Sequence, residues 1–152
     1  MASRAPMSHM ETALAEAGSA AARGEVPVGA VIVASDGRVL ATAGNRTREL
    51  RDPTAHAELL AIRAACAAIG EERLAGCDIY VTLEPCPMCA AAISFARIRR
   101  LYYGACDPKG GGVEHGARVF SQPTCHHAPE VYGAIDEAAA ARLLTQFFAE
   151  RR

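Results

Sequence analysis

The 152-residue sequence has no tryptophan, and aromatic residues make up only 5% of it. Its 16 basic residues include a single lysine, Lys109, and its formal net charge is −1. This balance excludes nucleic-acid binding driven by overall charge, so such binding would need a local basic patch. The chain also lacks an apolar run of about 18 residues and a charged-then-apolar leader, so we expect no membrane span and a cytoplasmic protein.

Six cysteines could form three disulfides, but composition argues against a disulfide framework. At 152 residues and 51% hydrophobic content, the chain can bury a core without covalent staples. We therefore expect one globular domain over residues 1–152, in which two cysteines bind a metal and four stay reduced. The six are Cys66, Cys77, Cys86, Cys89, Cys106 and Cys125.

Two of these cysteines form a C-x-x-C pair. Cys86 and Cys89 stand three positions apart at the expected start of a helix, so both sulfurs lie on one helix face. His56 is the best candidate for a third ligand, and two thiolates with one imidazole leave the fourth tetrahedral position of zinc open. That pattern predicts a catalytic zinc site. Glu58 can then approach the metal without binding it and transfer protons.

A C-x-x-C pair alone is also compatible with a redox dithiol or with half of a structural zinc site. The upstream His56-Ala57-Glu58 and the absence of a second C-x-x-C favour the catalytic interpretation. Glu58 could otherwise be an ordinary carboxylate near a helix N-terminus.

The first helix is predicted from its ends. Ser8 and Glu11 have the S-x-x-E spacing of a capping box, and Gly24 suits a left-handed C-terminal cap, so the helix should run to about Arg23. Residues 1–7 show no periodic pattern, and we expect them to form a loose, disordered end. Residues 26–33 are apolar and β-branched, which predicts a buried strand paired through an Asp36-Gly37 turn with a second strand.

That second strand is expected over residues 38–43. Pro53 disfavours helix at the preceding residue, so the next helix should begin with Thr54 as N-cap, with His56 and Glu58 in its first turn. Gly70 should end it. Its expected buried stripe is Leu59, Ile62, Cys66 and Ile69.

A strand over residues 79–83 should lead directly into the cysteine pair, and Pro87 fits the first position of a helix that ends at Phe95. The metal donors would then lie at helix N-termini, where the helix dipole favours thiolates. Further strands are expected at 98–104 and 130–135, separated by a glycine-rich irregular stretch over 107–116.

Asp136 should cap the last helix, with Phe147 facing inward and Phe148 exposed. The apolar face of this helix is predicted to contain Ala140, Leu143, Leu144, Phe147 and Phe148. This order of elements predicts an α/β fold with a mixed five-stranded sheet between two helix layers, a three-layer α/β/α arrangement.

The pattern H-x-E followed by P-C-x-x-C is the known signature of zinc-dependent nucleobase deaminases. Agreement extends over residues 25–30, 52–58, 80–86 and 147–148, and the sequence resembles the bacterial tRNA-specific adenosine deaminase family along almost its whole length. The resemblance implies a cytidine deaminase-like fold and conversion of the wobble adenosine of a tRNA anticodon to inosine. It also implies a homodimer with one zinc ion per subunit.

Carried over by matching positions, the resemblance makes His56, Cys86 and Cys89 the zinc ligands and Glu58 the proton shuttle. It further implies a base pocket lined by Val28, Asn45, the Ala57 backbone and Leu83. Asp107, Lys109, Phe148 and the terminal arginines would face the tRNA anticodon arm.

Two segments match the family loosely, residues 110–115 and 121–125, and these fall where RNA contacts are expected. A deaminase of a free nucleobase or nucleoside, such as guanine or cytosine, is therefore an alternative. A zinc-stabilised module that binds RNA or protein without turnover is a third hypothesis. Asn45, Asp107 and Lys109 could also be plain turn or loop residues, and the default for Arg97, Arg99 and Arg100 is a solvated face.

Overall fold

The computed structural model describes residues 7–151. The loose end expected over residues 1–7 falls almost entirely outside the described residues, as does Arg152. Within the described part, no helix is both long and apolar enough to cross a membrane.

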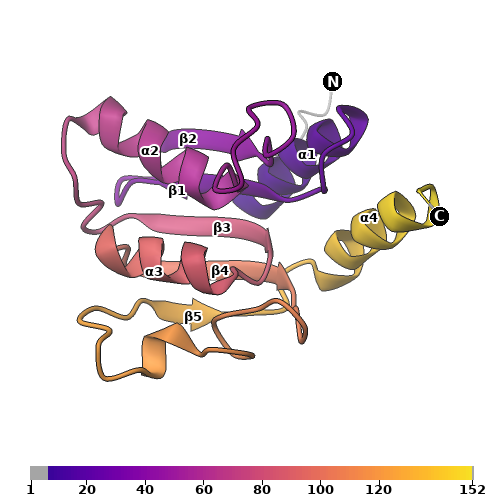
Figure 1. The fold of residues 1–152 in the computed structure, drawn as a ribbon. Helices are drawn as coiled ribbons and strands as arrows, with labels where there is room; N and C mark the ends of the chain where they lie inside the picture. Colours follow the sequence, from indigo (N-terminus) through magenta and orange to yellow (C-terminus); the bar gives the residue numbers. More distant parts are fainter. Residues whose placement is uncertain (1–6, 152) are drawn as a thin grey trace.

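The described residues form five strands and four α-helices around a central sheet (Figure 1). In chain order the elements are α1 (His9–Ala22), β1 (Gly29–Val33), β2 (Val39–Gly44), α2 (Ala57–Ile69), β3 (Asp78–Leu83), α3 (Pro87–Phe95), β4 (Arg100–Ala105), the 3₁₀ turn η1 (Val119–Ser121), β5 (Glu130–Tyr132) and α4 (Glu137–Ala149).

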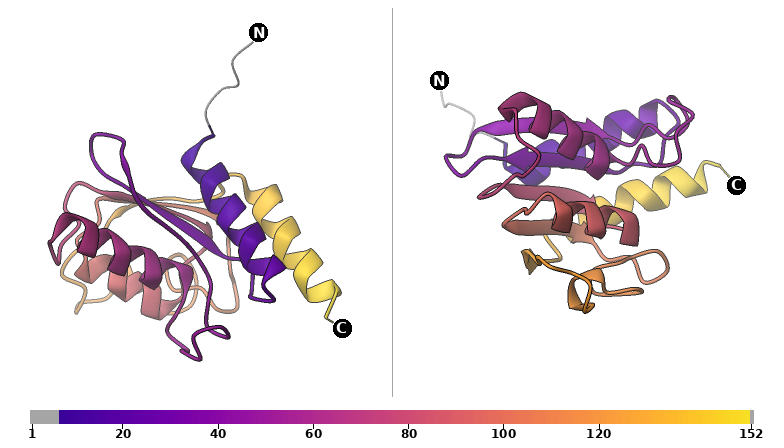
Figure 2. Two further views of the ribbon diagram at one scale, coloured as in Figure 1. Left: turned by 90° about the horizontal axis from the view of Figure 1, so that it is seen from above. Right: turned by 60° about the vertical axis from the view of Figure 1, so that its left-hand side comes forward.

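The sheet is mixed, with the strand order β2-β1-β3-β4-β5. Strand β1 is antiparallel to both of its neighbours, whereas β3, β4 and β5 are parallel to one another. Figure 2 shows α1 and α4 on one face of the sheet and α2 and α3 on the other. The predicted three-layer α/β/α fold is confirmed.

Helix α1 begins and ends as its sequence predicts. Ser8 Oγ accepts a hydrogen bond from the backbone N–H of Glu11, and the Glu11 carboxylate accepts one from the backbone N–H of Ser8, which completes the capping box. Arg23 is the C-cap residue, and Gly24 follows it in a left-handed conformation (φ 84°).

Two glycines let α1 lie close to the sheet. Gly29 of β1 and Gly44 of β2 pair across the strands. A Cβ atom on Gly29 would collide with the Ala13 carbonyl oxygen, and one on Gly44 would lie 2.8 Å from the Glu16 carbonyl oxygen. The backbone of α1 therefore rests directly on this pair.

The first hairpin forms as predicted, but β1 is shorter than expected. Residues 26–28 do not join the sheet. Pro27 has no N–H to donate, and the Val28 N–H donates to the Val26 carbonyl at 2.8 Å, which forms a tight turn. Val33, the last residue of β1 before the turn at Asp36 and Gly37, pairs with Asp78, the first residue of β3.

Helix α2 begins later than the sequence suggests. Thr54 is not its N-cap, because the Thr54 hydroxyl and N–H both bond Asp52 Oδ1, at 2.7 and 2.9 Å. His56 is the N-cap residue, and Ala57 is the first helical residue. Gly70 ends the helix in a left-handed conformation, as predicted.

The buried face of α2 also differs from the predicted stripe. The residues that pack against the sheet are small, with Ala57, Ala61 and Ala65 fully buried, because alanine allows a helix to lie close to β1 and β2. The larger members of the predicted stripe flank this contact. Leu59, Ile62 and Cys66 are only half-buried, and Ile69 is 37% exposed.

The C-terminal elements agree with the prediction in their order and differ in detail. Strand β5 spans only Glu130–Tyr132, because Ala134 adopts a positive φ of 60° that turns the chain away. Asp136 is the N-cap residue of α4, but its side chain caps nothing. Phe147 is buried and Phe148 is 48% exposed, as predicted.

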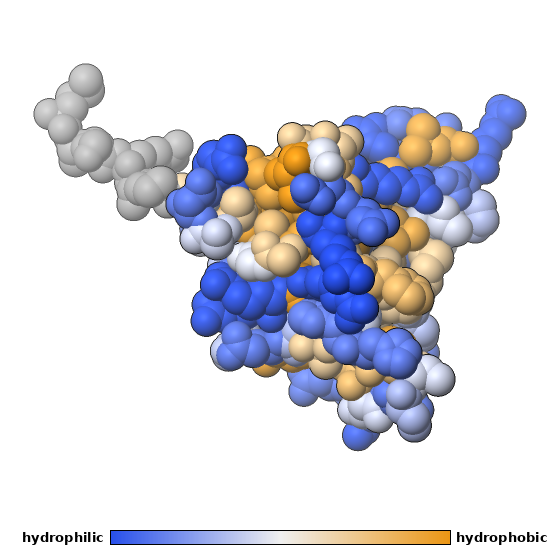
Figure 3. Space-filling model, turned by 90° about the vertical axis from the view of Figure 1, so that its left-hand side faces the viewer, coloured by the Kyte–Doolittle hydropathy of each residue, from blue (hydrophilic) through white to orange (hydrophobic). Residues whose placement is uncertain are grey.

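The two ends of the sheet differ in character. At the end where β3 begins, hydrophilic residues cover the middle of the surface (Figure 3). Arg99 pairs there with Asp78 at 3.1 Å, and Arg100 pairs with Glu130 at 2.8 Å. These arginines are thus ion-paired surface residues, and they lie far from the opposite end, where β3 leads into α3.

Candidate metal centre

Three potential metal donors meet where α2 and α3 begin. His56 is the N-cap residue of α2, Cys86 is the N-cap residue of α3, and Cys89 lies in the first turn of α3. His56 Nδ1 lies 3.6 Å from Cys86 Sγ and 3.4 Å from Cys89 Sγ. The three donor atoms all lie within 4.8 Å of one another.

This spacing suits a tetrahedral zinc ion. Bonds of about 2.0 Å to nitrogen and about 2.3 Å to sulfur at tetrahedral angles separate the two atoms by roughly 3.5 Å. The two observed Nδ1 to Sγ distances, 3.4 and 3.6 Å, lie on either side of that value. The placement of His56 relative to both thiols therefore suits a shared zinc ion.

The charge of the donor set also suits a cation. Hydrogen bonds from Cys89 and His56 lower the pKa of the Cys86 thiol to about 4. The pairing with Cys86 raises the pKa of Cys89, and the hydrogen bond to Cys86 raises the pKa of His56. One thiolate is thus stable among these side chains, and a second needs a positive ion beside it.

Glu58 lies in the first turn of α2, two residues after His56, and is only 4% exposed. Burial raises the pKa of its carboxyl to about 6, because water is excluded from the charged form. Glu58 does not belong to the donor cluster. It is placed beside the donors as a carboxyl that can both hold and release a proton.

A cavity of about 340 Å³ opens over the donors. His56, Cys86 and Glu58 line it, whereas Cys89 is fully buried behind them. The other residues from the sequence analysis that line this cavity are Val28, Asn45, Leu83 and Asp107.

The remaining predicted site residues lie outside the cavity lining. Ala57 is fully buried at the start of α2. Lys109 is exposed on the loop after β4, and Phe148 is exposed on α4. The Arg151 guanidinium lies 3.6 Å from the centre of the Phe147 ring, over its face.

The sequence analysis assigned no role to two buried glutamates near the cavity, Glu25 and Glu84. Glu84 follows β3 and lines the cavity, and Glu25 lies between α1 and β1. Both carboxylates accept hydrogen bonds from backbone N–H groups of loops that border the cavity. Both residues fall in stretches that resemble the family, 25–30 and 80–86, and Glu84 is also close to Cys86 in the sequence.

Comparison with known proteins agrees with this geometry. Residues 4–105 match the family model described as the cytidine and deoxycytidylate deaminase zinc-binding region. The chain belongs to this deaminase family. It is 69% identical over 143 residues to a tRNA-specific adenosine deaminase of Agrobacterium fabrum, covering 94% of this chain and 93% of that relative. The resemblance found in the sequence is thereby confirmed.

Solved structures of deaminases share the fold. One comes from a study of A-to-I editing by tRNA:A34 deaminases at the wobble position of transfer RNA. It has 69% identity, a TM-score of 0.88, and covers 90% of this chain and 98% of its own. A guanine deaminase from Bacillus subtilis has 32% identity and a TM-score of 0.65, and covers 94% and 91% of the two chains. Deaminases with this fold thus act on more than one substrate.

Proposed function

We propose that this protein is a zinc-dependent enzyme that hydrolytically deaminates the wobble adenosine of a tRNA anticodon to inosine. The observation that carries the proposal is the cluster of His56, Cys86 and Cys89 at the base of a cavity that Glu58 also lines. This cluster occurs in a chain that is 69% identical to a tRNA-specific adenosine deaminase.

We assign one zinc ion per chain to His56, Cys86 and Cys89. Zinc held by such a donor set supplies a Lewis acid that makes water nucleophilic near neutral pH. The helix N-termini at α2 and α3 support the assignment, since their free N–H groups and dipoles favour the negative charge of thiolates.

In this mechanism Glu58 moves the protons. It accepts a proton from the attacking water and delivers it to N1 of the adenine ring as C6 is attacked. It then assists the departure of the 6-amino group as ammonia. The burial of Glu58 beside His56 and Cys86 supports this role, because a carboxyl held there can reach both the water and the base.

The cavity wall is suited to a flat base. Val28 and Leu83 contribute apolar surface, and the Asn45 side chain has no hydrogen-bond partner among residues 7–151. We propose that this amide recognises an edge of the base and that the Ala57 backbone N–H assists it. An anticodon base is unpaired, so it enters such a cavity at little unstacking cost.

RNA binding would use the loops around the cavity. Residues 46–54 form one such loop, in which Thr47 lines the cavity and Arg48 and Arg51 are exposed, so it offers the local basic patch that a chain of net charge −1 requires. We propose that Asp107 contacts the flipped nucleotide. Lys109, Phe148 and the terminal arginines would contact the rest of the anticodon arm.

We further propose that the enzyme works in the cytoplasm as a homodimer. All six cysteines are free thiols, which fits a reducing compartment. Phe95 on α3 is 79% exposed, and it borders an apolar groove of about 540 Å³ between α3 and η1. An exposed apolar surface of this kind supports contact with a second copy of the chain. Light scattering would measure the mass, and a monomer would contradict the dimer.

The decisive experiment compares substrates. The protein would be incubated with an anticodon stem-loop that carries adenosine at the wobble position, with the same stem-loop carrying guanosine there, and with free guanine. The expected result is inosine from the first substrate, with no xanthosine in the second and no xanthine from free guanine. Deamination of free guanine alone would instead support the alternative, a deaminase of a free nucleobase or nucleoside, which the likeness to the Bacillus subtilis guanine deaminase keeps open.

A further inference from the structure

Glu84 is a buried carboxylate that the proposed chemistry does not use. It follows β3 directly and is 2% exposed. Its Oε2 accepts hydrogen bonds from the backbone N–H groups of Val113 (3.2 Å), Glu114 (3.0 Å) and His115 (3.1 Å). Its Oε1 accepts from the Asp107 backbone N–H at 3.0 Å and lies 2.7 Å from His115 Nδ1.

These five contacts occupy the whole carboxylate. An ionised carboxylate only accepts hydrogen bonds, through about two lone pairs on each oxygen. All the acceptor sites of Glu84 are therefore engaged by residues of the protein, which separates its role from that of Glu58.

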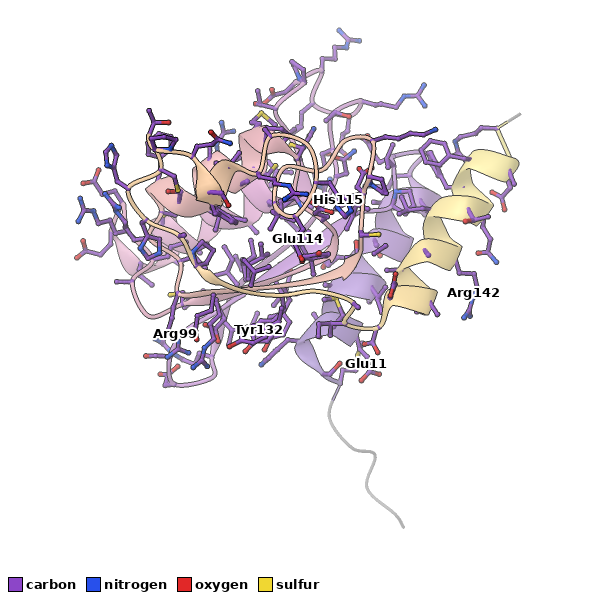
Figure 4. All side chains as sticks on the ribbon, turned by 90° about the horizontal axis from the view of Figure 1, so that it is seen from below. Glu11, Arg99, Glu114, His115, Tyr132 and Arg142 are labelled. Atoms are coloured by element: carbon purple, nitrogen blue, oxygen red, sulfur yellow. The ribbon has the colours of Figure 1, made fainter. Side chains whose placement is uncertain are left out.

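The groups that surround Glu84 belong to one loop, residues 107–116. Three successive N–H groups converge on one oxygen, the arrangement in which backbone amides bind an anion. Figure 4 shows Glu114 and His115 side by side on this loop. The loop also contributes Asp107 and Gly110 to the cavity lining. The loop 107–116, which forms part of the cavity wall, is thus folded around the buried carboxylate of Glu84.

Glycines make this close wrapping possible. A Cβ atom on Gly111 would lie 2.5 Å from Glu84 Oε2, and one on Gly112 would lie 2.5 Å from the Pro87 nitrogen. The Gly112 N–H donates to the Pro85 carbonyl at 2.8 Å. The loop is therefore packed against the residues on either side of Cys86, which gives Gly111 and Gly112 a structural reason.

We propose that Glu84 is a positioning residue for the deamination reaction, which holds the loop 107–116 against the start of α3 and so sets Asp107 and Gly110 at the substrate cavity. The kinetic part of this inference rests on the proposed function. The anchoring part rests on the contacts alone.

Glu25 provides an internal comparison. This carboxylate is 1% exposed, and it accepts hydrogen bonds from the backbone N–H groups of Arg48 (3.1 Å) and Glu49 (2.9 Å). These residues lie on the other loop beside the cavity, 46–54. The two glutamates thus hold two separate loops, and a variant of either serves as the control for the other.

The anchoring part is tested by hydrogen–deuterium exchange of the zinc-loaded protein. Glu84→Gln keeps the shape of the side chain but turns an NH₂ group towards backbone donors. We expect the amides of Asp107 and residues 113–115 to exchange at least about tenfold faster, as the loss of buried hydrogen bonds requires. Glu25→Gln should accelerate only the amides of Arg48 and Glu49. Unchanged exchange at 113–115 in Glu84→Gln would overturn the anchor.

The positioning part is tested by kinetics on the anticodon stem-loop. We expect Glu84→Gln to raise KM by roughly tenfold and to change kcat by less than about threefold, because the loop holds substrate and not the proton shuttle. Zinc content should stay at the wild-type ratio. An unchanged KM, or a loss confined to zinc content, would overturn the positioning role. A wild-type protein that forms no inosine would contradict the proposed function, while the exchange experiment still decides the anchor.

Milder variants cover the case in which Glu84→Gln does not fold. His115 is partly exposed, and His115→Ala removes only its Nδ1 contact with Glu84, one of the five. It should therefore raise KM by a smaller factor than Glu84→Gln does. Tyr103→Phe removes the hydroxyl that donates from β4 to Glu114 of the same loop and leaves the Glu84 contacts untouched. A KM effect in Tyr103→Phe as large as that in His115→Ala would contradict a specific role for Glu84.

Discussion

Gly29 and Gly44 face each other across β1 and β2, directly beneath the backbone of α1. Because a Cβ on Gly44 would press on the Glu16 carbonyl, Gly44→Ala must displace the helix from the sheet. We expect it to lower the free energy of unfolding by about 1–3 kcal/mol, the usual cost of overpacking. Urea denaturation would measure the loss.

Gly18→Ala is the matched control for this substitution. Gly18 lies within α1, and among residues 7–151 no atom beyond its own stretch of helix lies within 4 Å of the position that its Cβ would occupy. The same added methyl group should therefore raise the free energy of unfolding by about 0.5–1 kcal/mol, since alanine is the better helix former. Equal effects in the two variants would show that α1 does not rest on Gly44.

Metal removal should destabilise the protein together with its site. The donors join the starts of α2 and α3, so a chelator should remove one equivalent of zinc and lower the Tm. Cys89→Ala should do the same without chelator, whereas Cys106→Ala, at an exposed cysteine outside the donor cluster, should match the wild type in zinc content and Tm. If zinc leaves and the Tm does not move, the site is independent of the fold.

Glu58→Gln separates an enzyme from a binding module. The amide cannot carry protons, so we expect a loss of kcat of at least roughly 10²-fold with zinc content unchanged. Ser94→Ala offers a buried control away from the donors, since its hydroxyl bonds the His127 carbonyl at 2.6 Å. Glu58→Gln with full activity and RNA affinity would favour a zinc-stabilised module that binds without turnover.

Added salt should weaken the binding of the anticodon stem-loop. Contacts between arginine and phosphate release counterions, so the affinity should fall steeply as the salt concentration rises. Fluorescence titration at several salt concentrations would measure the slope. Arg48→Ala should make the slope shallower, because this residue is exposed on the loop beside the cavity. A flat response in the wild type would favour a small neutral substrate.

Much of the fold could be predicted because it depends on local signals. The capping box at Ser8, the turn at Asp36 and the proline at the start of α3 each act within a few residues, and all three are confirmed. The buried face of α2 was predicted only in part. Ile62 and Cys66 pack against the core but are half-buried, whereas the fully buried positions are alanines, which allow close packing on the sheet.

The candidate site, too, could be predicted only in part. The meeting of His56 with the two cysteines follows from a motif of side chains, and the structure brings these donors together, while their role as zinc ligands stays a prediction. The anchors Glu84 and Glu25 could not be predicted, because their partners are backbone N–H groups from remote segments. Every residue except proline has a backbone N–H group, so the residue types of these partners do not reveal the contact.

The turn between β1 and β2 has a practical consequence. Asp36 and Gly37 lie at the end of the sheet where β3 begins, and the donors lie where β3 has ended. A fluorescent label or an immobilisation tag inserted at this turn would project away from the cavity. In a protein attached to a surface through this turn, the opening of the cavity would then face the solution.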